Sequence, residues 1–162
     1  MCLIVFAWQI VPGAPLIAAA NRDEFYDHPA SAAGSWPEHP QVYAGRDLKG
    51  GGSWMGITRE NAHGSKFAAL TNIRGPGERR IDAPSRGALV ADYLAGELSA
   101  PEYIASIADA GAAYNGFNLV LGDRDRLYWF SNRGEDDAPT ARRWNRGSTA
   151  FRMVCWTRRG RK

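Results

Sequence analysis

The sequence predicts an α+β fold, with antiparallel strands before and after a central pair of helices. Three observations favour it. Short apolar runs bounded by turn residues recur within residues 3–72, helical spacing of apolar residues follows over 84–111, and a hairpin pattern comes after that. The 162 residues, 44% of them hydrophobic, are enough for one domain with its own core.

The first part of the chain has the pattern of strands separated by turns. Residues 3–10 and 16–22 are expected to form two strands joined by the turn "VPGAP". Residues 27–52 contain many Pro and Gly, and they are predicted to be a long ordered loop with at most a short strand at 42–44. Further strands are expected near 53–58 and in "KFAALTN".

The second part of the chain begins with the helical pattern. Apolar residues recur with helical spacing over 84–98, which predicts a first helix. Ser99, followed by Pro101 and Glu102, resembles a capping box and predicts a second helix that ends near Gly111. The segments "FNLVLGD" and "LYWFSN" then predict a hairpin around "DRDR".

The composition narrows the classes of function. The formal net charge is +3, but six of the 20 Lys and Arg lie in residues 144–162, which contain no acid. The rest of the chain, which holds all 17 Asp and Glu, is therefore slightly acidic. An argument for nucleic-acid binding would rest on those last residues alone, so no nucleic-acid partner is expected.

The sequence also bears on localisation. No apolar stretch approaches the roughly 18 residues of a membrane span, and the first residues lack the basic region of a secretory signal. Cys2 and Cys155 alone do not make a disulfide framework. We therefore expect a cytoplasmic protein without a membrane span.

Cys2 stands at a position where one residue can supply two reactive groups. Removal of the initiator Met before a small residue would leave a thiol and an α-amine on Cys2. An α-amine has a pKa of about 7.7–8.0 in model peptides, so it can act as the base for its own thiol. The simpler interpretation, which stays open, is that Cys2 is a small buried hydrophobe.

The second expected strand ends in the polar run Asn21–Glu24. If the first turn centres near residue 13, Cys2 faces roughly residue 24, and strand alternation places Arg22 and Glu24 on one face and Asp23 on the other. Asp23 would hold the amine, and Arg22 would favour the thiolate, because a nearby cation lowers the pKa of a thiol. A solvated cluster of ion pairs at a hairpin end is the alternative.

A set of motifs distributed along the chain adds a family resemblance. They are "MCLIVFAW", "ANRDEFYDHPA", "GGSWMGIT", "FAALTNIR", "SRGALVADYL", "YNGFNLVLGD" and "LYWFSNR". In their order the chain resembles, over about residues 1–143, the NRDE family of transport and Golgi organisation protein 2. The resemblance implies a four-layer αββα sandwich of the N-terminal nucleophile hydrolase type. The similarity is greatest to cysteine acylases such as penicillin V acylase and choloylglycine hydrolase, whose second-strand Arg and Asp are matched by Arg22 and Asp23.

The resemblance implies an amidohydrolase that acts on a carboxamide or related acyl substrate. The Cys2 thiolate would attack the carbonyl, the α-amine would shuttle the proton, and water would release the acyl group. An oxyanion hole is then needed. Asn72, at the end of "LTN", is the best candidate for it, ahead of Asn118, although a turn Asn at a strand end is an equally simple interpretation.

The alternative is a non-catalytic protein that binds and traffics haem or a lipid or acyl-CoA ligand, functions with which the family has been connected. Haem needs a His, Cys or Tyr axial ligand. His28, His39 and His63 are the only histidines, and all lie in loop-like stretches where a surface position is the simpler expectation. No CxxCH, HExxH or CxxC pattern occurs, so we expect no metal site and no resident cofactor.

Residues 144–162 depart from the family pattern. Family members continue through a segment similar to "LxPGxYGLSNxxLDTPWPK", whereas this chain has "WNRGSTAFRMVCWTRRGRK". One synonymous choice of codons for these residues, read from one nucleotide earlier, encodes "LEPGVYGFSNGLLDTPWPK". We therefore expect residues 1–143 to be the N-terminal part of an NRDE domain and residues 144–162 to be an out-of-frame basic tail. The sandwich would then be incomplete at its C-terminus.

Overall fold

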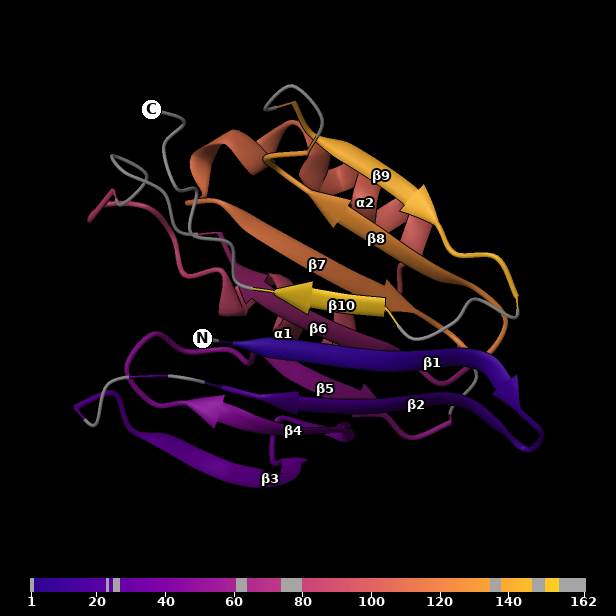
Figure 1. Cartoon of the computed structure of the whole chain (residues 1–162). Helices are drawn as coiled ribbons and strands as arrows, with labels where there is room; N and C mark the ends of the chain where they lie inside the picture. The colour runs from indigo at the N-terminus through magenta and orange to yellow at the C-terminus, as the bar shows by residue number, and fades with distance from the viewer. Residues whose placement is uncertain are drawn as a thin grey trace.

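The computed structural model contains antiparallel sheets and helices, which confirms the α+β class (Figure 1). Within its described part, two sheets are stacked and helices cover the outer face of the larger one. The structure describes residues 2–22, 24, 27–60, 64–73, 80–134, 138–146 and 151–154.

The smaller sheet holds the beginning of the chain. In the described residues it has the order β10-β1-β2, formed by β1 (Leu3–Val11), β2 (Ala14–Asn21) and β10 (Phe151–Val154). The strands are antiparallel, with Leu3 paired to Asn21 on one side and to Val154 on the other. The expected first hairpin is confirmed.

The larger sheet is an antiparallel meander in which each strand pairs with its neighbours in the sequence. Its described strands follow the order β3-β4-β5-β6-β7-β8-β9. The strands are β3 (Ala30–Trp36), β4 (His39–Asp47), β5 (Met55–Thr58), β6 (Phe67–Asn72), β7 (Phe117–Gly122), β8 (Leu127–Ser131) and β9 (Thr140–Arg143).

A first apolar core lies between the two sheets. Strand alternation aims one face of β1 at the larger sheet, because side chains along a strand point to opposite faces in turn. The buried residues of this core are Ile4, Phe6, Trp8, Phe67, Ala69, Val120 and Leu127. The opposite face of β1–β2 is less covered, and Ile17 there is 46% exposed.

A second apolar core lies between the larger sheet and the helices α1 (Gly87–Ala95) and α2 (Ala100–Ala108), which η1 (Ala110–Ala113) follows. The predicted capping box is confirmed at the start of α2, where the backbone N–H of Ser99 donates to Glu102 at 2.9 Å. At the end of α1, the buried Lys66 Nζ donates to the carbonyl oxygens of Tyr93, Gly96 and Leu98 at 3.1, 2.8 and 2.9 Å. The bonds to Tyr93 and Gly96 satisfy acceptors that the helix end leaves open, and the bond to Leu98 satisfies one in the segment that follows.

The expectation of a long loop over 27–52 is wrong. Most of this segment forms the hairpin of β3 and β4, with Gly34 paired to Ala44 and Ser35 to Tyr43. Small, mostly exposed residues occupy β3 before its buried last residue, Trp36, so the segment lacks the apolar alternation that would reveal a strand. Pairing with β4, whose Val42 and Ala44 are buried, holds β3 in place.

Candidate functional site

Cys2 lies immediately before β1 and belongs to the inward face of that strand. Ile4, Phe6 and Trp8 occupy alternate positions and are at most 2% exposed, and Cys2 is 8% exposed. Leu3 pairs with Asn21, so the same register continued by one residue sets Cys2 opposite Arg22. Directly opposed residues project from the same face of a sheet, and both side chains therefore face the larger sheet.

Cys2 was expected to face residue 24, whereas the register sets it opposite residue 22, and the geometry of the turn explains the difference. β1 extends to Val11, and only Pro12 and Gly13 separate it from β2, so the turn is tighter than the five residues "VPGAP". Gly13 has φ +79°, a conformation that favours glycine. An irregularity between Trp8 and Val11 also shifts the pairing. The opposed pair is consequently Cys2 and Arg22 rather than Cys2 and Glu24.

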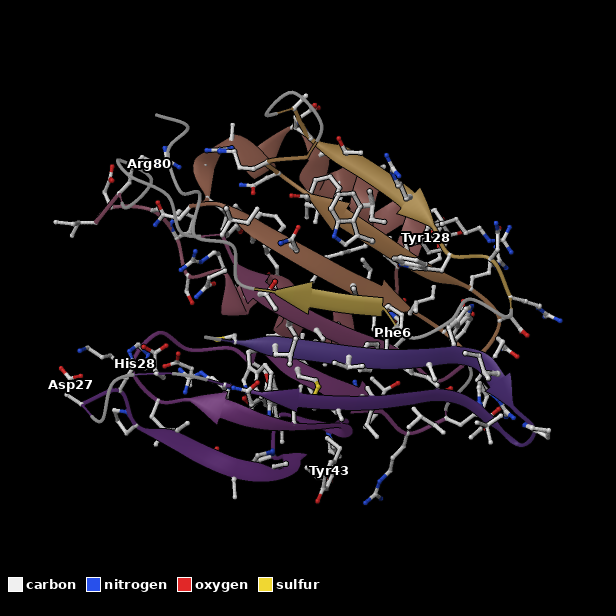
Figure 2. All side chains as sticks on the ribbon, viewed as in Figure 1. Phe6, Asp27, His28, Tyr43, Arg80 and Tyr128 are labelled. Atoms are coloured by element: carbon white, nitrogen blue, oxygen red, sulfur yellow. The ribbon has the colours of Figure 1, made fainter. Side chains whose placement is uncertain are left out.

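Contacts at the far end of β1 show which edge of the sandwich holds Cys2. The Gln9 side chain donates to the backbone oxygen of Arg124, in the turn between β7 and β8, at 2.5 Å. The start of β1 therefore lies at the opposite edge, where β4 and β6 end and β7 begins. Figure 2 shows His28 at this same edge, near the start of the chain.

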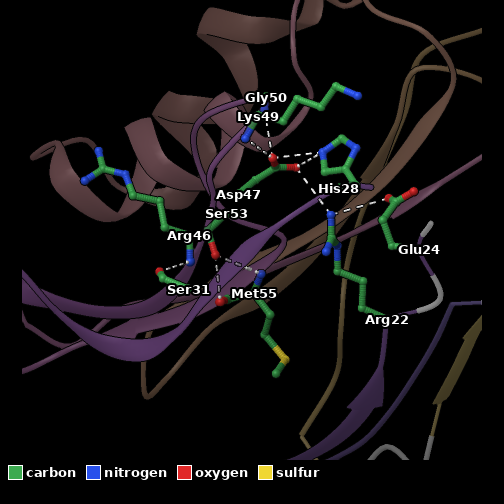
Figure 3. A network of polar contacts seen from close by, with 10 residues as sticks. All are labelled: Arg22, Glu24, His28, Ser31, Arg46, Asp47, Lys49, Gly50, Ser53 and Met55. Carbon is green, nitrogen blue, oxygen red and sulfur yellow. Dashed lines mark hydrogen bonds and ion pairs between the residues drawn. The ribbon is translucent and has the colours of Figure 1, made fainter. Parts of the chain in front are cut away.

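Arg22 connects the two sheets at this edge (Figure 3). Its Nη2 atom lies 3.3 Å from Asp47 Oδ2, at the end of β4, and 3.4 Å from Glu24 Oε2. His28 Nε2 lies 2.9 and 2.8 Å from the two carboxylate oxygens of Asp47. The network fixes the guanidinium between Glu24 and the end of β4, with 19% of the Arg22 side chain exposed.

Asp47 is positioned by the turn that follows it. Its Oδ1 accepts hydrogen bonds from the backbone N–H groups of Lys49 at 3.0 Å and Gly50 at 2.7 Å. Burial opposes ionisation of Asp47, but the hydrogen bonds from Gly50, Lys49 and His28 outweigh it, so the pKa lies below its ordinary value. The carboxylate is therefore charged at neutral pH and can pair with Arg22.

The glycines after this turn allow close approach to α1. Gly52 has φ +73°, and a Cβ atom there would lie 2.3 Å from the carbonyl oxygen of Gly87. The next residue, Ser53, donates its backbone N–H to that same oxygen at 3.1 Å. The segment "LKGGGS" thus links the Asp47 turn to the start of a helix, which a larger residue at position 52 would obstruct.

The other predicted site residues have different placements. Asn72 ends β6 at the same edge, and strand alternation assigns it to the helix-side face with Ala68 and Leu70. Its neighbour Thr71 belongs to the face turned toward β1. Asp23 lies outside the described residues, as does His63. The roles of Cys2, Arg22, Asp23 and Asn72 stay predictions.

Sequence reasoning missed Asp47 and the arrangement of His28. His28 was expected at the surface, whereas its side chain is 25% exposed and pairs with Asp47. A signal for Asp47 existed in "RDLKGGG", because an Asp before a Gly-rich turn often accepts the following backbone N–H groups. No sequence pattern, however, brings residues 22, 28 and 47 together, since the contact depends on how the two sheets stack.

Neither helix within the described ranges has the length and apolar character that crossing a bilayer requires.

Comparison with known proteins identifies relatives across most of the chain. The family model described as Transport and Golgi organisation 2 matches residues 1–152, and so reaches into the 144–162 segment. The Transport and Golgi organization protein 2 homologs of Bos taurus and Homo sapiens are 40% and 36% identical over 147 and 149 residues. These alignments cover 83% and 85% of this chain, and 51% and 52% of the relatives.

A further relative also matches over about half of its own length. Transport and Golgi organization protein 2 of Drosophila melanogaster is 36% identical over 129 residues, which are 74% of this chain and 45% of the relative. The chain spans about half the length of the curated relatives it matches. With the family model matching nearly the whole sequence, the chain belongs to the Transport and Golgi organisation 2 family.

Proposed function

We propose that the edge formed by β1, β2 and the end of β4 is an N-terminal cysteine nucleophile site that hydrolyses a carboxamide or related acyl substrate. The observation that carries the proposal is the Leu3–Asn21 register, which continued by one residue sets the inward-facing Cys2 opposite Arg22, together with the Arg22 guanidinium 3.3 Å from Asp47. A fixed cation directly across from a thiol favours the thiolate, which is the nucleophilic form. Arg22 would supply the cation of the site, while Glu24 and Asp47 hold its guanidinium in place.

The reaction would proceed in two halves. After removal of Met1, the α-amine of Cys2 takes the thiol proton and the sulfur attacks the carbonyl carbon. The C–N bond then breaks, and the leaving amine takes the proton from the α-ammonium group, which leaves a thioester on Cys2. Water, deprotonated by the same α-amine, attacks the thioester, and the thiol is regenerated as the carboxylic acid departs.

The remaining groups would stabilise charge. The resemblance to cysteine acylases assigns Asp23 to the α-amine, and we retain this assignment as part of the proposal. It assigns Asn72 to the oxyanion, but strand alternation turns Asn72 to the helix-side face of β6, so that role stays a prediction outside the proposed mechanism. Cys2 is 8% exposed, so the substrate would have to enter at the sheet edge. That edge is also where Arg22 and Asp47 lie.

The fold is compatible with a sandwich of the N-terminal nucleophile hydrolase type. Within the described residues, the layers are helices, the larger sheet and the smaller sheet. A four-layer sandwich would carry further helices on the outer face of β1–β2. The 46% exposure of Ile17 on that face supports the interpretation that a layer is missing from the described part.

The test is acylation of Cys2. Intact mass should first show that Met1 has been removed, since a retained Met1 would block the α-amine and refute the mechanism. The protein is then treated with p-nitrophenyl acetate and mapped by peptide mass, with Cys2→Ala as the test variant and Cys155→Ala as the matched control. We expect acetylation at Cys2 in the wild type and in Cys155→Ala, and its loss in Cys2→Ala. An acetylated Cys155 with an unmodified Cys2 would refute the proposal.

The same experiment separates catalysis from the carrier alternative. A carrier for haem or an acyl ligand would retain ligand binding in Cys2→Ala and would show no acylation of the wild type. His28, one histidine available to such a ligand, has its Nε2 atom 2.8 Å from Asp47 Oδ2, and haem ligation through that atom would break this contact. Nothing in the described structure favours the carrier, so we do not propose it.

A further inference from the structure

Thr71 is a buried polar residue that the proposed mechanism does not use. It is 1% exposed, and its Oγ1 atom has no hydrogen-bond partner among the described residues. Leaving a buried hydroxyl without a partner costs free energy, because the group loses its hydrogen bonds to water on folding. An unpaired hydroxyl in a core is therefore a feature that needs an explanation.

The register of the larger sheet shows where this hydroxyl points. Thr71 lies two positions beyond Ala69 along β6, so it projects toward β1 as Ala69 does. Ala69 packs in the same cluster as Ile4, and Cys2 lies two positions before Ile4 along β1. Moving along β6 from Ala69 to Thr71 and along the chain from Ile4 to Cys2 leads toward the same edge of the sandwich. The opposite end of β1 contacts the turn between β7 and β8, at the other edge. Thr71 and Cys2 thus both project between the two sheets at the same edge of the sandwich.

A second polar side chain lies beside Thr71. Asn118 on β7 pairs directly with Thr71, and it in turn pairs with Ser131 on β8. The Ser131 hydroxyl already donates to the backbone oxygen of Phe117 at 3.0 Å. Among these three residues, Thr71 has the hydroxyl that remains available to a ligand, with the half-buried Asn118 as its neighbour.

We propose that Thr71, supported by Asn118, binds the carbonyl oxygen of the acyl group that Cys2 attacks. This inference rests on the proposed function. The Thr71 O–H would donate to the carbonyl oxygen in the substrate, and more strongly to the oxyanion of the intermediate, since hydrogen bonds to charged acceptors are the stronger ones. The ligand class is a small amide, ester or thioester whose carbonyl reaches between the sheets at the edge that holds Cys2. Thr71 would be its substrate-binding residue.

Replacement of the hydroxyl by a methyl group tests this role. Thr71→Val keeps the shape of the side chain, and Thr71→Ser keeps the hydroxyl. Thr140→Val is the control, because it makes the same chemical change on β9, which β7 and β8 separate from the strand of Thr71. Each variant is acylated with p-nitrophenyl acetate. In a separate reaction it is alkylated with iodoacetamide, in which the thiol attacks a carbon other than the carbonyl carbon, so no oxyanion donor is needed. Urea unfolding of every variant confirms that it folds.

The expected result is specific to acylation. Removing one oxyanion donor slows an acyl-transfer step by about 100-fold or more in well-formed sites, so we expect Thr71→Val to slow acetylation of Cys2 at least 10-fold. Alkylation should change less than twofold, Thr71→Ser should retain most of the acetylation rate, and Thr140→Val should match the wild type. Wild-type acetylation in Thr71→Val would overturn the inference, as would an equal loss in both reactions.

The outcomes also separate this inference from the function on which it rests. If the wild type is acetylated at Cys2 and Thr71→Val reacts equally fast, only the role of Thr71 fails. If the wild type is not acetylated at Cys2 at all, the proposed nucleophile fails, and the role of Thr71 fails with it.

Discussion

Replacing Asp47 by Asn should weaken the contact that joins the two sheets at the candidate site. The change removes the negative charge facing Arg22, whose Nη2 atom lies 3.3 Å from Oδ2, and facing His28 at 2.8 Å. An Asn side chain still offers an oxygen to the backbone N–H groups of Lys49 and Gly50, which bond to Asp47 at 3.0 and 2.7 Å. The substitution therefore tests the charged contacts and spares the turn.

The magnitude follows from partial burial. Hydrogen bonds to charged groups contribute about 1.5–3 kcal/mol in buried settings, whereas exposed ion pairs contribute about 0.2–1 kcal/mol. The side chains of Arg22 and Asp47 are 19% and 22% exposed, between these limits. We expect the free energy of unfolding at pH 7 to fall by about 1–2 kcal/mol in Asp47→Asn.

Asp123→Asn provides a matched control. Asp123 Oδ1 accepts the backbone N–H groups two and three residues ahead, from Asp125 at 2.8 Å and Arg126 at 2.9 Å, as Asp47 does from Lys49 and Gly50. Because Asn can make the same turn bonds, we expect Asp123→Asn to change the free energy of unfolding by no more than about 0.5 kcal/mol. The measurement is urea unfolding followed by tryptophan fluorescence.

The cost of Asp47→Asn should also depend on pH. The pKa of Asp47 is lower in the folded protein than the value of about 3.9 expected in the unfolded chain. Its stabilising contribution is thus fully present above the unfolded pKa and is lost as the pH falls through the folded one. The gap in unfolding free energy between wild type and Asp47→Asn should be present at pH 7 and narrow below about pH 4. Equal stability of the two proteins at pH 7, or an equal loss in Asp123→Asn, would refute the reasoning.

Three further predictions concern the turn after Asp47, the end of α1 and the last residues. Gly52→Ala should destabilise the fold by about 2 kcal/mol or more in urea unfolding, because φ is +73° and the new Cβ would lie 2.3 Å from the Gly87 oxygen. Gly13→Ala is the control and should cost less, because φ is also positive but no atom lies within 4 Å of the new Cβ. Lys66→Met should lower the unfolding free energy by about 2–3 kcal/mol, since it removes the donor shared by three carbonyl oxygens at the end of α1; no loss would show that those bonds contribute little. For residues 144–162, which we propose to be an out-of-frame tail, the encoding DNA read from one nucleotide earlier should give the family segment, and sequencing that finds incompatible codons would remove the proposal.

Prediction from the sequence succeeded where the signal was local. Ser99 and Glu102 stand three positions apart and make the capping box that begins α2, as expected. The two helices came from apolar periodicity, although α1 is shorter than the predicted 84–98, because periodicity marks the buried face better than the ends. β6 and the β7–β8 hairpin were found in the same way, from short apolar runs between turn residues.

Prediction failed where stability comes from pairing rather than from composition. The small residues of β3 have no strand pattern, and the hairpin exists because β4 offers a buried partner edge. β9 was missed for a similar reason, since its residues Thr140–Arg143 are mostly exposed and polar. Strand preference depends strongly on neighbours, so such edge strands are poorly visible in a single sequence.

The sequence by itself determined the family, the fold class and the closeness of Cys2 to the polar end of β2, since a hairpin joins segments that are near in the chain. Only the tertiary structure decided which residue faces Cys2 across the hairpin. It also decided the contact of Arg22 with Asp47 and the burial of the Thr71 hydroxyl on the face of β6 turned toward β1. They depend on turn length and on the stacking of two sheets, and those are set by the packing of side chains distant in sequence, which no local pattern records.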